Sequence, residues 1–286
     1  MCELTQVSRA SFYRDWEQRA PSEAEVALRD AVQQTALAHR GYGYRRITPL
    51  VQHAGFVVGQ EKVRHILRSD NLLAVRRRKF VVTTDSNHRF RVHPNLAESM
   101  ELTAINQLWV ADITYIRLRW EFVFLAVVLD AFSRKAIGWE LGRTLETKLA
   151  LAALEAAIGS RNPQPGLVHH SDRGTQYASH EYVQRLEACG AHLSMSRPAR
   201  PWENGKCESF IKTLKREEID ARRYTDFADL RQHLKEFIEQ IYNQARLHSA
   251  LGYRSPEEFE RSQIPGVKWS PAALSFVRHE EIYPDV

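Results

Sequence analysis

Cysteine and long apolar runs are scarce in this sequence of 286 residues. The three cysteines, Cys2, Cys189 and Cys207, are odd in number and widely spaced, so they predict neither a disulfide framework nor a Cys-x-x-Cys zinc site. The longest apolar run, residues 122–129, is too short to span a bilayer, and residues 1–20 lack the apolar stretch of a signal peptide. We therefore expect a cytoplasmic protein with no membrane partner.

Several motifs of common enzyme classes are also absent. The sequence has no Walker loop, no Rossmann glycine pattern and no serine or cysteine nucleophile motif. Gly41 and Gly43 lie between predicted helices and do not follow a strand, so they do not form a phosphate-binding loop. These absences exclude the enzyme classes that are built on such motifs.

Positive charge is present but unevenly placed. Residues 1–100 hold 16 Lys and Arg against 10 Asp and Glu, whereas residues 101–286 hold 24 against 25. A chain of this length accommodates one large domain and one smaller domain. A basic first third beside a nearly neutral remainder indicates a polyanionic partner, most simply nucleic acid.

After an N-terminal segment (residues 1–21), residues 22–75 predict a small all-α domain. Apolar residues recur at helical spacing over 23–40, 44–53 and 60–69, and glycines separate the three segments. Such helices form either a helix-turn-helix or a plain bundle. The basic residues favour DNA binding, with Arg45 and Arg46 as candidate contacts.

Residues 76–104 are typical of a linker, because a basic run is followed by a polar stretch without periodicity. The run either is simply solvated or follows a phosphate backbone. Its candidate DNA contacts are Arg76, Arg77, Arg78 and Lys79.

The pattern becomes α/β from residue 105 to residue 262, and residues 263–286 form a C-terminal tail. Three successive strands followed by alternating helices and strands predict a mixed sheet flanked by helices. The fully apolar run 122–129 is typical of a central strand that is covered on both faces. The expected strands are 108–118, 122–129, 135–141, 167–170 and 191–194, and the expected helices are 147–158, 179–189, 202–217 and 226–242.

Three acidic residues within this α/β region are candidates for chemistry. Asp112 interrupts an otherwise apolar strand, where a carboxylate is costly unless it is paired or bound to a metal, although an aspartate at a strand edge can also reach water. Asp172 follows a strand, where α/β folds place ligand groups, but Asp-x-Gly is equally ordinary turn chemistry. Glu208 lies on the polar margin of a predicted helix, where it either leans over the sheet edge or forms a solvated pair with Lys212.

Together the three carboxylates suit phosphoryl transfer. Two Mg²⁺ ions ~3.5–4 Å apart can activate the attacking oxygen and stabilise the leaving oxygen of an in-line displacement. Hard oxygen ligands favour Mg²⁺ or Mn²⁺.

Longer strings around these residues carry a family resemblance. They are Trp-Val-Ala-Asp-Ile-Thr-Tyr-Ile (109–116), Ala-Val-Val-Leu-Asp-Ala-Phe-Ser-Arg (126–134), His-Ser-Asp-Arg-Gly-Thr-Gln-Tyr-Ala-Ser (170–179), Ser-Met-Ser-Arg (194–197), Glu-Asn-Gly-Lys-Cys-Glu-Ser-Phe (203–210) and Tyr-Asn-Gln-Ala-Arg-Leu-His-Ser-Ala-Leu-Gly-Tyr-Arg-Ser-Pro (242–256). Asp172 and Glu208 are separated by 35 residues. With this spacing the chain resembles the retroviral-integrase-like Asp-Asp-Glu transposases of bacterial insertion sequences, of the OrfB type of IS family three.

The resemblance implies an RNase H-like catalytic core and a preceding helix-turn-helix. It implies that Asp112, Asp172 and Glu208 hold two Mg²⁺ or Mn²⁺ ions, and that the enzyme nicks insertion-sequence ends and transfers the freed 3′-OH to target DNA. The partners implied are double-stranded DNA, further copies of the chain and an OrfA protein or fusion, in a bacterial cytoplasm at the nucleoid. The expected DNA contacts in the core are Lys215, Lys212, Asn204 and Arg173.

The chain departs from the family at Gly205, where relatives usually have alanine. Glycine weakens a helix start by up to ~1 kcal/mol relative to alanine, so we expect the helix to begin towards Lys206. Two other functions stay open. One is a silent DNA-binding regulator formed by an OrfB-only product, and the other is a general RNase H-like nuclease.

Overall fold

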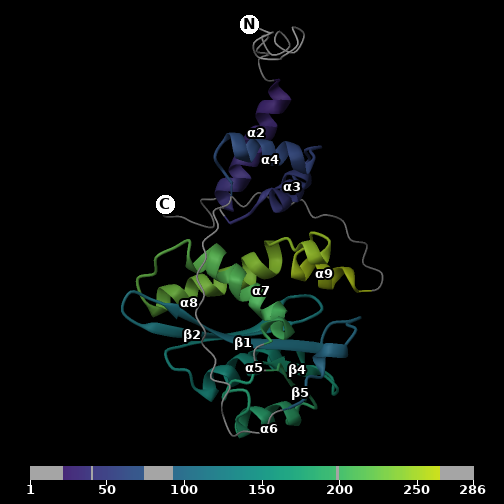
Figure 1. Cartoon of the computed structure of the whole chain (residues 1–286), viewed down its shortest axis with the longest axis vertical. Helices are drawn as coiled ribbons and strands as arrows, with labels where there is room; N and C mark the ends of the chain where they lie inside the picture. Colours follow the sequence, from purple (N-terminus) through teal and green to yellow (C-terminus); the bar gives the residue numbers. More distant parts are fainter. Residues whose placement is uncertain (1–21, 40, 74–92, 198–199, 265–286) are drawn as a thin grey trace, which may run out of the picture. The chain divides into compact units, whose positions relative to one another are not determined.

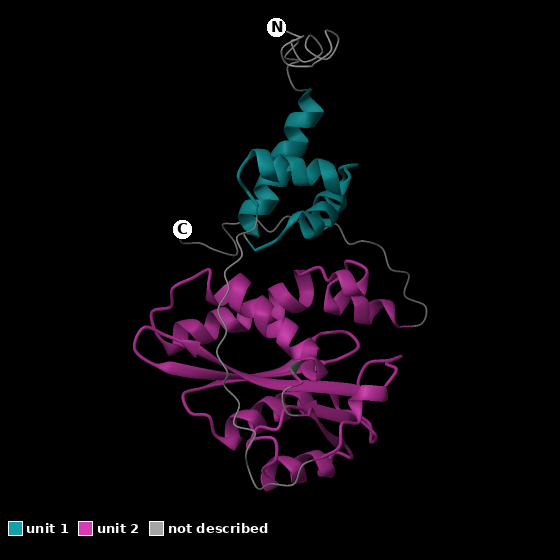
Figure 2. Ribbon diagram, in the orientation of Figure 1, with its two compact units in different colours: residues 1–74, 272–286 teal, residues 75–271 magenta. Residues whose placement is uncertain are grey.

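The structure, a computed structural model, describes residues 22–39, 41–73, 93–197 and 200–264. The chain divides into two compact units (Figure 2). Unit 1 contains the described residues up to Leu73, and unit 2 contains those from His93 onward. The basic run Arg76, Arg77, Arg78 and Lys79 lies outside the described residues. No helix in the described parts is long and apolar enough to cross a membrane.

Unit 1 is built from three helices, α2 (Glu23–Ala38), α3 (Tyr44–His53) and α4 (Gln60–Ser69). A capping box between Ser22 and Glu25 starts α2. The apolar stripes of the three helices meet in a small core around Val32, Ile47 and Val63, each with no exposed surface. The helices coincide closely with the segments predicted from the apolar spacing.

An ion pair fixes the first helix of unit 1 to the last. The Arg29 guanidinium of α2 donates to the Asp70 carboxylate just past α4, and Gln33 donates to the same carboxylate at 2.8 Å. The guanidinium holds the pKa of Asp70 well below its ordinary value. These contacts hold α2 against the end of α4. Helix α3 lies between these two helices in the sequence.

Unit 2 is organised on a five-stranded mixed sheet with the order β3-β2-β1-β4-β5. The strands β1 to β3 form an antiparallel meander, whereas β4 and β5 run parallel to β1. The strands are β1 (Leu108–Arg117), β2 (Phe122–Asp130), β3 (Ala136–Gly142), β4 (Val168–Ser171) and β5 (His192–Met195). The predicted strands are therefore confirmed to within a residue or two at each end.

Helices cover both faces of the sheet (Figure 1). On one face, α5 (Thr147–Arg161) and α6 (His180–Ala188) pack on alternate strand residues such as Trp109 and Val128. On the other face, α7 (Gly205–Leu214), α8 (Phe227–Lys235) and the π-helix η4 (Glu236–Ala245) pack on the intervening residues, such as Val110 and Val127. A further helix, α9 (Pro256–Ser262), contacts η4. The apolar character of 122–129 thus reflects burial on both faces, as predicted.

The helix that carries Glu208 differs from the single helix expected over 202–217. A 3-10 turn, η2 (Pro201–Asn204), precedes α7, which begins at Gly205, one residue before the expected Lys206. The last turn is a π-helix, η3 (Lys215–Ile219), in which the Asp220 amide donates to the Lys215 carbonyl at 2.7 Å. The helix predicted over 226–242 likewise continues into η4 in π geometry. The spacing of apolar residues does not distinguish 3-10, α and π segments of a helix, because successive segments bury the same side of the helix.

Candidate active site

Asp112 and Asp172 lie side by side because of the register between β1 and β4. The parallel pairs are Leu108 with Val168, Trp109 with His169, and Val110 with His170. Continuing this register by two residues brings Asp112 opposite Asp172, just past the carboxyl end of β4. Side chains two residues apart share a face, so both aspartates lie on the face of the sheet that α7 covers.

The environment of Asp112 is strongly unfavourable for a lone carboxylate. Burial and the neighbouring charge of Asp172 raise its pKa to about 8, with a smaller contribution from Glu208. The Ile113 amide donates to its Oδ1 at 2.8 Å, and Lys215 also acts against this rise. The three carboxylates therefore share one electrostatic environment, in which Asp172 affects Asp112 more strongly than Glu208 does.

Asp172 begins a tight turn. Its Oδ1 accepts a hydrogen bond from the Gly174 amide at 2.9 Å. A Cβ at position 174 would lie 3.0 Å from the same oxygen, which is closer than nearly all real contacts of this kind. The turn chemistry that the Asp-x-Gly string indicates is thus present, and it orients the Asp172 carboxylate.

Glu208 lies in the first turn of α7, on the margin of an apolar stripe formed by Cys207, Phe210 and Leu214. Its side chain is 31% exposed and accepts from Lys212 Nζ at 3.3 Å. The position on the helix margin is as expected, and of the two alternatives for the side chain the structure has the pair with Lys212. An exposed pair of this kind contributes little stability, so it leaves the carboxylate available for other partners.

Two side chains just before α7 fix where the helix begins. The buried Asn204 donates through Nδ2 to the Ala111 carbonyl at 2.9 Å, beside Asp112 on β1. Glu203 accepts from the Arg197 amide at 2.7 Å and from Asn95 Nδ2 at 3.0 Å. The Asn204 bond ties the start of the helix that carries Glu208 to the strand that carries Asp112, and the Glu203 bonds hold the same region to Arg197 and Asn95. The sequence did not reveal this role for Asn204, and the predicted DNA contact of Asn204 stays a prediction.

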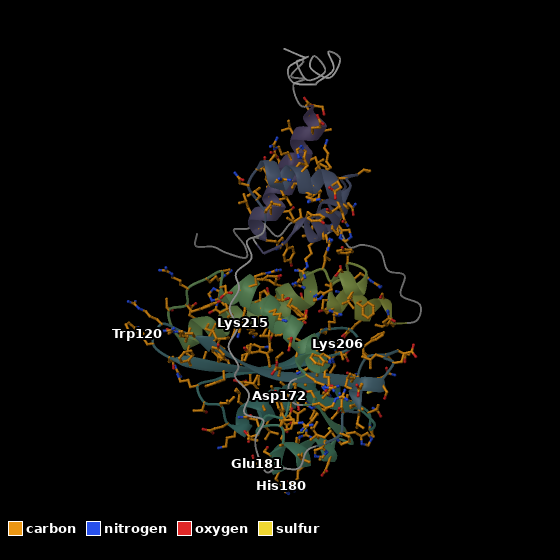
Figure 3. All side chains as sticks on the ribbon, in the orientation of Figure 1. Trp120, Asp172, His180, Glu181, Lys206 and Lys215 are labelled. Carbon is orange, nitrogen blue, oxygen red and sulfur yellow. The ribbon has the colours of Figure 1, made fainter. Side chains whose placement is uncertain are left out.

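Lys215 begins the π-helix η3 and lies near the carboxylates. Its Nζ is 4.7 Å from the centroid of the Tyr115 ring, and it interacts electrostatically with Asp112. Burial lowers its pKa, although the charges of Asp220 and Asp112 oppose that shift. Figure 3 shows Lys215 on the α7 side of the sheet, above Asp172 in that view. The cation is therefore placed beside the site, where a phosphate could reach it.

Hard oxygen donors of this kind suit Mg²⁺ or Mn²⁺. Among the described residues, no three His, Cys, Asp or Glu side chains are arranged closely enough to hold a metal ion. Glu208 accepts from Lys212 at 3.3 Å, and the oxygen donors of Asp112, Asp172 and Glu208 are of the type that divalent cations prefer.

Other candidates near the site have structural roles. Asp130 is buried and accepts from the backbone amides of Asn106 at 2.7 Å and Ser133 at 2.8 Å, so it caps the turn after β2. His169 and His170 are both fully buried. They bond to Tyr182 at 3.0 Å and to Ser194 at 2.8 Å, respectively. Both histidines are therefore packed side chains of β4.

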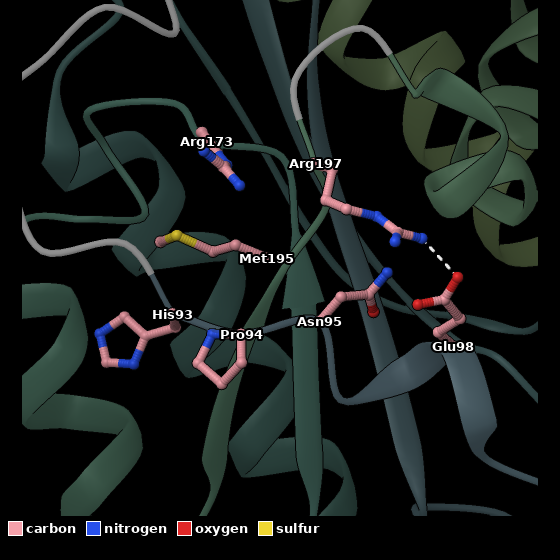
Figure 4. Close-up of a pocket in the computed structure, with 7 residues that line it drawn as sticks. All are labelled: His93, Pro94, Asn95, Glu98, Arg173, Met195 and Arg197. Carbon is pink, nitrogen blue, oxygen red and sulfur yellow. Dashed lines mark hydrogen bonds and ion pairs between the residues drawn. The ribbon is translucent and has the colours of Figure 1, made fainter.

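A shallow pocket of about 480 Å³ lies next to this site (Figure 4). Its cationic lining residues are Arg173, which donates to the Ser196 carbonyl at 3.0 Å, and Arg197, which pairs with Glu98. Asp112, Asp172 and Glu208 are not among the residues that line it. The pocket therefore adjoins the carboxylates without containing them.

The two arginines predicted to contact DNA in unit 1 both begin α3. Arg45 is exposed, and its guanidinium lies 5.6 Å from the Tyr44 ring centroid. Arg46 is partly buried and lies 5.3 Å from the ring of Tyr42. Both side chains are thus supported by aromatic rings at the start of one helix.

Comparison with known families separates the same two units. An HTH-like domain family matches residues 23–80. Integrase core domain families match residues 103–201 and residues 189–256. The helix-turn-helix prediction is therefore confirmed against the plain bundle, and the mixed sheet with helices on both faces is the RNase H-like core of the integrase type.

Solved structures show more distant likenesses. A simian T-cell lymphotropic virus intasome matches at 17% identity and a TM-score of 0.46, covering 80% of this chain and 74% of that chain. The catalytic core domain of BIV integrase matches at 18% identity and a TM-score of 0.42, covering 54% and 93%. The HTLV-2 integrase catalytic core domain, in complex with magnesium, matches at 17% identity and a TM-score of 0.39, covering 51% and 92%.

Much closer relatives come from bacterial insertion sequences. The transposase for IS904 of Lactococcus lactis is 36% identical over 85% of this chain and 98% of its own length. A 31 kDa protein of IS600 from Shigella sonnei is 34% identical, covering 91% and 97%. The transposase InsF for IS3A of Escherichia coli is 32% identical, covering 92% and 94%. The chain therefore belongs to the Asp-Asp-Glu transposases of bacterial insertion sequences, in IS family three.

Proposed function

We propose that Asp112, Asp172 and Glu208 are the catalytic and metal-binding residues of this transposase. The reaction is nicking at the end of an insertion sequence to free a 3′-OH, followed by attack of that 3′-OH on target DNA. The observation that carries the proposal is the β1–β4 register, which brings Asp112 beside Asp172 on the face that α7 and Glu208 cover. Two negatively charged carboxylates on neighbouring strands repel each other and destabilise the fold unless a cation offsets their charge.

The three carboxylates would hold Mg²⁺ or Mn²⁺, two ions per site. Bound there, the ions would supply charge stabilisation for the attacking and leaving oxygens of the phosphoryl transfer. The chain itself sets the ligand positions. Asn204 ties α7 to β1, and the Gly174 amide orients Asp172. Lys212 donates to Glu208 at 3.3 Å, and it would remain beside that carboxylate as a cation for a nearby phosphate.

Basic residues around the core and in unit 1 would hold the DNA. Lys215, Lys212 and Arg173 lie next to the three carboxylates in space or in sequence and are suited to phosphates near the reacting bond. Arg45 and Arg46 at the start of α3 would contact the end of the element. The remaining proposed contacts are Asn204, Arg76, Arg77, Arg78 and Lys79.

The substrates are double-stranded DNA of the element ends and of the target. Bringing two ends together requires more than one protomer, so we expect a homo-oligomer on DNA, with an OrfA protein as a further partner or fusion. The protein would act at the nucleoid, in the bacterial cytoplasm.

The test uses the purified chain, a labelled duplex that carries the candidate element end, and Mg²⁺ or Mn²⁺. Site-specific nicking and joining is expected from the wild type and is expected to disappear in Asp112→Ala and Glu208→Gln. Asp226→Ala is a matched control, because Asp226 caps α8 away from the site. Binding without metal-dependent cleavage would support a silent regulator instead, and indiscriminate cleavage of RNA–DNA hybrids would support a general nuclease.

A further inference from the structure

The hairpin between β1 and β2 exposes large aromatic and cationic side chains together. Trp120 is 85% exposed and Phe122 is 53% exposed. Arg117 and Arg119, on the other arm of the same turn, are exposed as well. The Leu118 amide donates to the Glu121 carbonyl at 2.9 Å and closes the turn, and Trp120 projects from the body of unit 2 (Figure 3). Two large aromatic side chains exposed at one turn form an apolar surface of the kind that marks an interaction site.

A continuous series of contacts connects this turn with the candidate active site. Lys215, beside Asp112, lies 4.7 Å from the Tyr115 ring centroid. The Tyr115 ring meets the Phe122 ring at a centroid distance of 6.0 Å. Arg117 lies 5.7 Å from the Phe122 ring, and Arg119 lies 4.8 Å from the Trp120 ring. We name this surface the hairpin strip, and its members are Tyr115, Arg117, Arg119, Trp120, Phe122 and Lys215.

The cations of the hairpin strip differ from other cations of unit 2. Within the described part of the chain, no carboxylate lies within ion-pair distance of Arg117, Arg119 or Lys215. In contrast, Arg143 pairs with Glu121 at 3.0 Å, and Arg231 pairs with Glu140. Each of the strip's cations faces an aromatic ring instead. Arg117 and Arg119 therefore carry positive charge without a carboxylate partner, next to exposed rings, whereas Lys215 lies near the charge of Asp112.

We propose that the hairpin strip binds the phosphate backbone of the DNA duplex that extends from the active site. The inference rests on the proposed function, because it takes the reacting phosphate to lie at Asp112. Arg117 is five residues beyond Asp112 on β1, which corresponds to ~17 Å, and this odd spacing places the two side chains on opposite faces of the strand. The strip therefore continues from Lys215 around β1 to the hairpin, whose end lies roughly 25 Å from Asp112. At about 3.4 Å per nucleotide along one strand, these residues reach phosphates roughly five to eight nucleotides from the reacting one.

Charge favours DNA over a second protein as the occupant of the strip. Charged residues are depleted at the centre of protein–protein interfaces, whereas DNA-binding surfaces are strongly positive and often combine cations with aromatic rings. The one acidic residue in the turn, Glu121, is already paired with Arg143. A polyanion therefore suits this surface better than a copy of the chain does.

The first measurement is the salt dependence of binding to a 30-base-pair duplex of fixed sequence. The double variant Arg117→Ala/Arg119→Ala is expected to reduce the slope of log K against log salt by about 1.8, since each lost phosphate contact contributes about 0.9. The control is Arg143→Ala/Arg231→Ala, which removes the same charge from ion-paired positions. Equal slopes for the hairpin variant and the wild type would overturn the proposal.

The second measurement varies the length of the DNA. Two short duplexes are used, one ending roughly three base pairs upstream of the reacting phosphate and one ending roughly three base pairs downstream of it. Each is compared with a long duplex that extends more than roughly ten base pairs on both sides. The variants Trp120→Ala and Arg117→Ala/Arg119→Ala are expected to bind the long duplex more weakly than the wild type and to bind one of the short duplexes equally well. If Trp120→Ala changes only self-association in sedimentation, the strip is a protein interface and the proposal is wrong.

These outcomes separate the two proposals. Wild-type nicking together with an unchanged slope and length dependence in the variants refutes the hairpin strip and leaves the proposed function intact. Absence of metal-dependent nicking, together with a reduced slope in the hairpin variant, refutes the proposed function and supports DNA binding by the strip.

Discussion

The two faces of the five-stranded sheet differ in how their polar side chains are paired. On the face of α5 and α6, the polar side chain of His169 bonds to Tyr182, and the helix packs directly on the strands. On the face of α7, Asp112 and Asp172 are placed together with like charge, and Glu208 approaches them from the helix. The first arrangement stabilises the fold, whereas the second costs stability that a bound cation can return.

The largest expected effect is a loss of strand-transfer activity when Asp172 is replaced, with Asp130 as the control position. Asp172→Asn is expected to reduce strand transfer by at least about 10³-fold, because charge stabilisation by bound metal amounts to several kcal/mol. Asp130→Asn is the matched control. It disturbs a turn cap with four backbone or hydroxyl donors, and should lower Tm while specific activity per folded molecule stays within a few-fold. Gel assays of joined products, normalised to the folded fraction, measure both. Similar activity losses in the two variants would remove the distinction between the faces.

A second prediction concerns packing on the α5 face. A Cβ at Gly138 would lie 2.2 Å from the Ala153 carbonyl oxygen and 2.7 Å from the Ala157 amide, and both are helix backbone. Gly138→Ala is therefore expected to destabilise unit 2 by about 3 kcal/mol, at the upper end of overpacking costs. Gly159→Ala in the same helix meets nothing within 4 Å, and it should be neutral or stabilising by up to about 1 kcal/mol. Urea unfolding measures the stability of both variants. Equal free energies of unfolding for Gly138→Ala and Gly159→Ala would show that α5 can shift to make room for the added methyl group.

The smallest expected effect is a pH dependence of stability on the same face. Burial, with a smaller effect of His170, lowers the pKa of His169 to about 3. The unfolded chain binds a proton near pH 6.5, but the folded chain excludes it. Stability is therefore full above about pH 6.5 and falls as the pH drops below that value, by at most about 1.4 kcal/mol per pH unit for this group.

Replacing His169 tests that dependence. His169→Gln keeps a polar group opposite Tyr182 and should reduce the slope of unfolding free energy between pH 6.5 and pH 5 by up to one proton. His192→Gln is the control, because His192 is exposed on the same sheet. An unchanged slope in His169→Gln would mean that this histidine does not remain neutral in the fold.

Much of the fold was predictable because apolar alternation and helical spacing are local properties. The strand over 122–129 and the stripe of Cys207, Phe210 and Leu214 follow directly from such patterns. The family strings predict the triad, although each carboxylate alone has an equally good structural explanation. The domain boundaries and the basic arm of residues 76–79 stay predictions.

Other features depend on contacts between distant segments. The parallel register that brings Asp112 beside Asp172, the bond from Asn204 to the Ala111 carbonyl, and the π-geometry after Leu214 all arise from tertiary packing. The exposure of Trp120 is likewise a property of the folded chain, since an aromatic residue between two strands is as often buried. None of these follows from periodicity, because a single sequence does not encode strand pairing or helix ends directly.

The central claim is that the α7 face carries one metal site formed by Asp112, Asp172 and Glu208. Calorimetric titration of the purified chain with Mn²⁺, without DNA, tests it independently of activity. Saturable binding is expected for the wild type and for Asp130→Asn, and its loss is expected in Asp112→Asn. Binding of Mn²⁺ by Asp112→Asn with wild-type affinity would show that these carboxylates do not form the metal site.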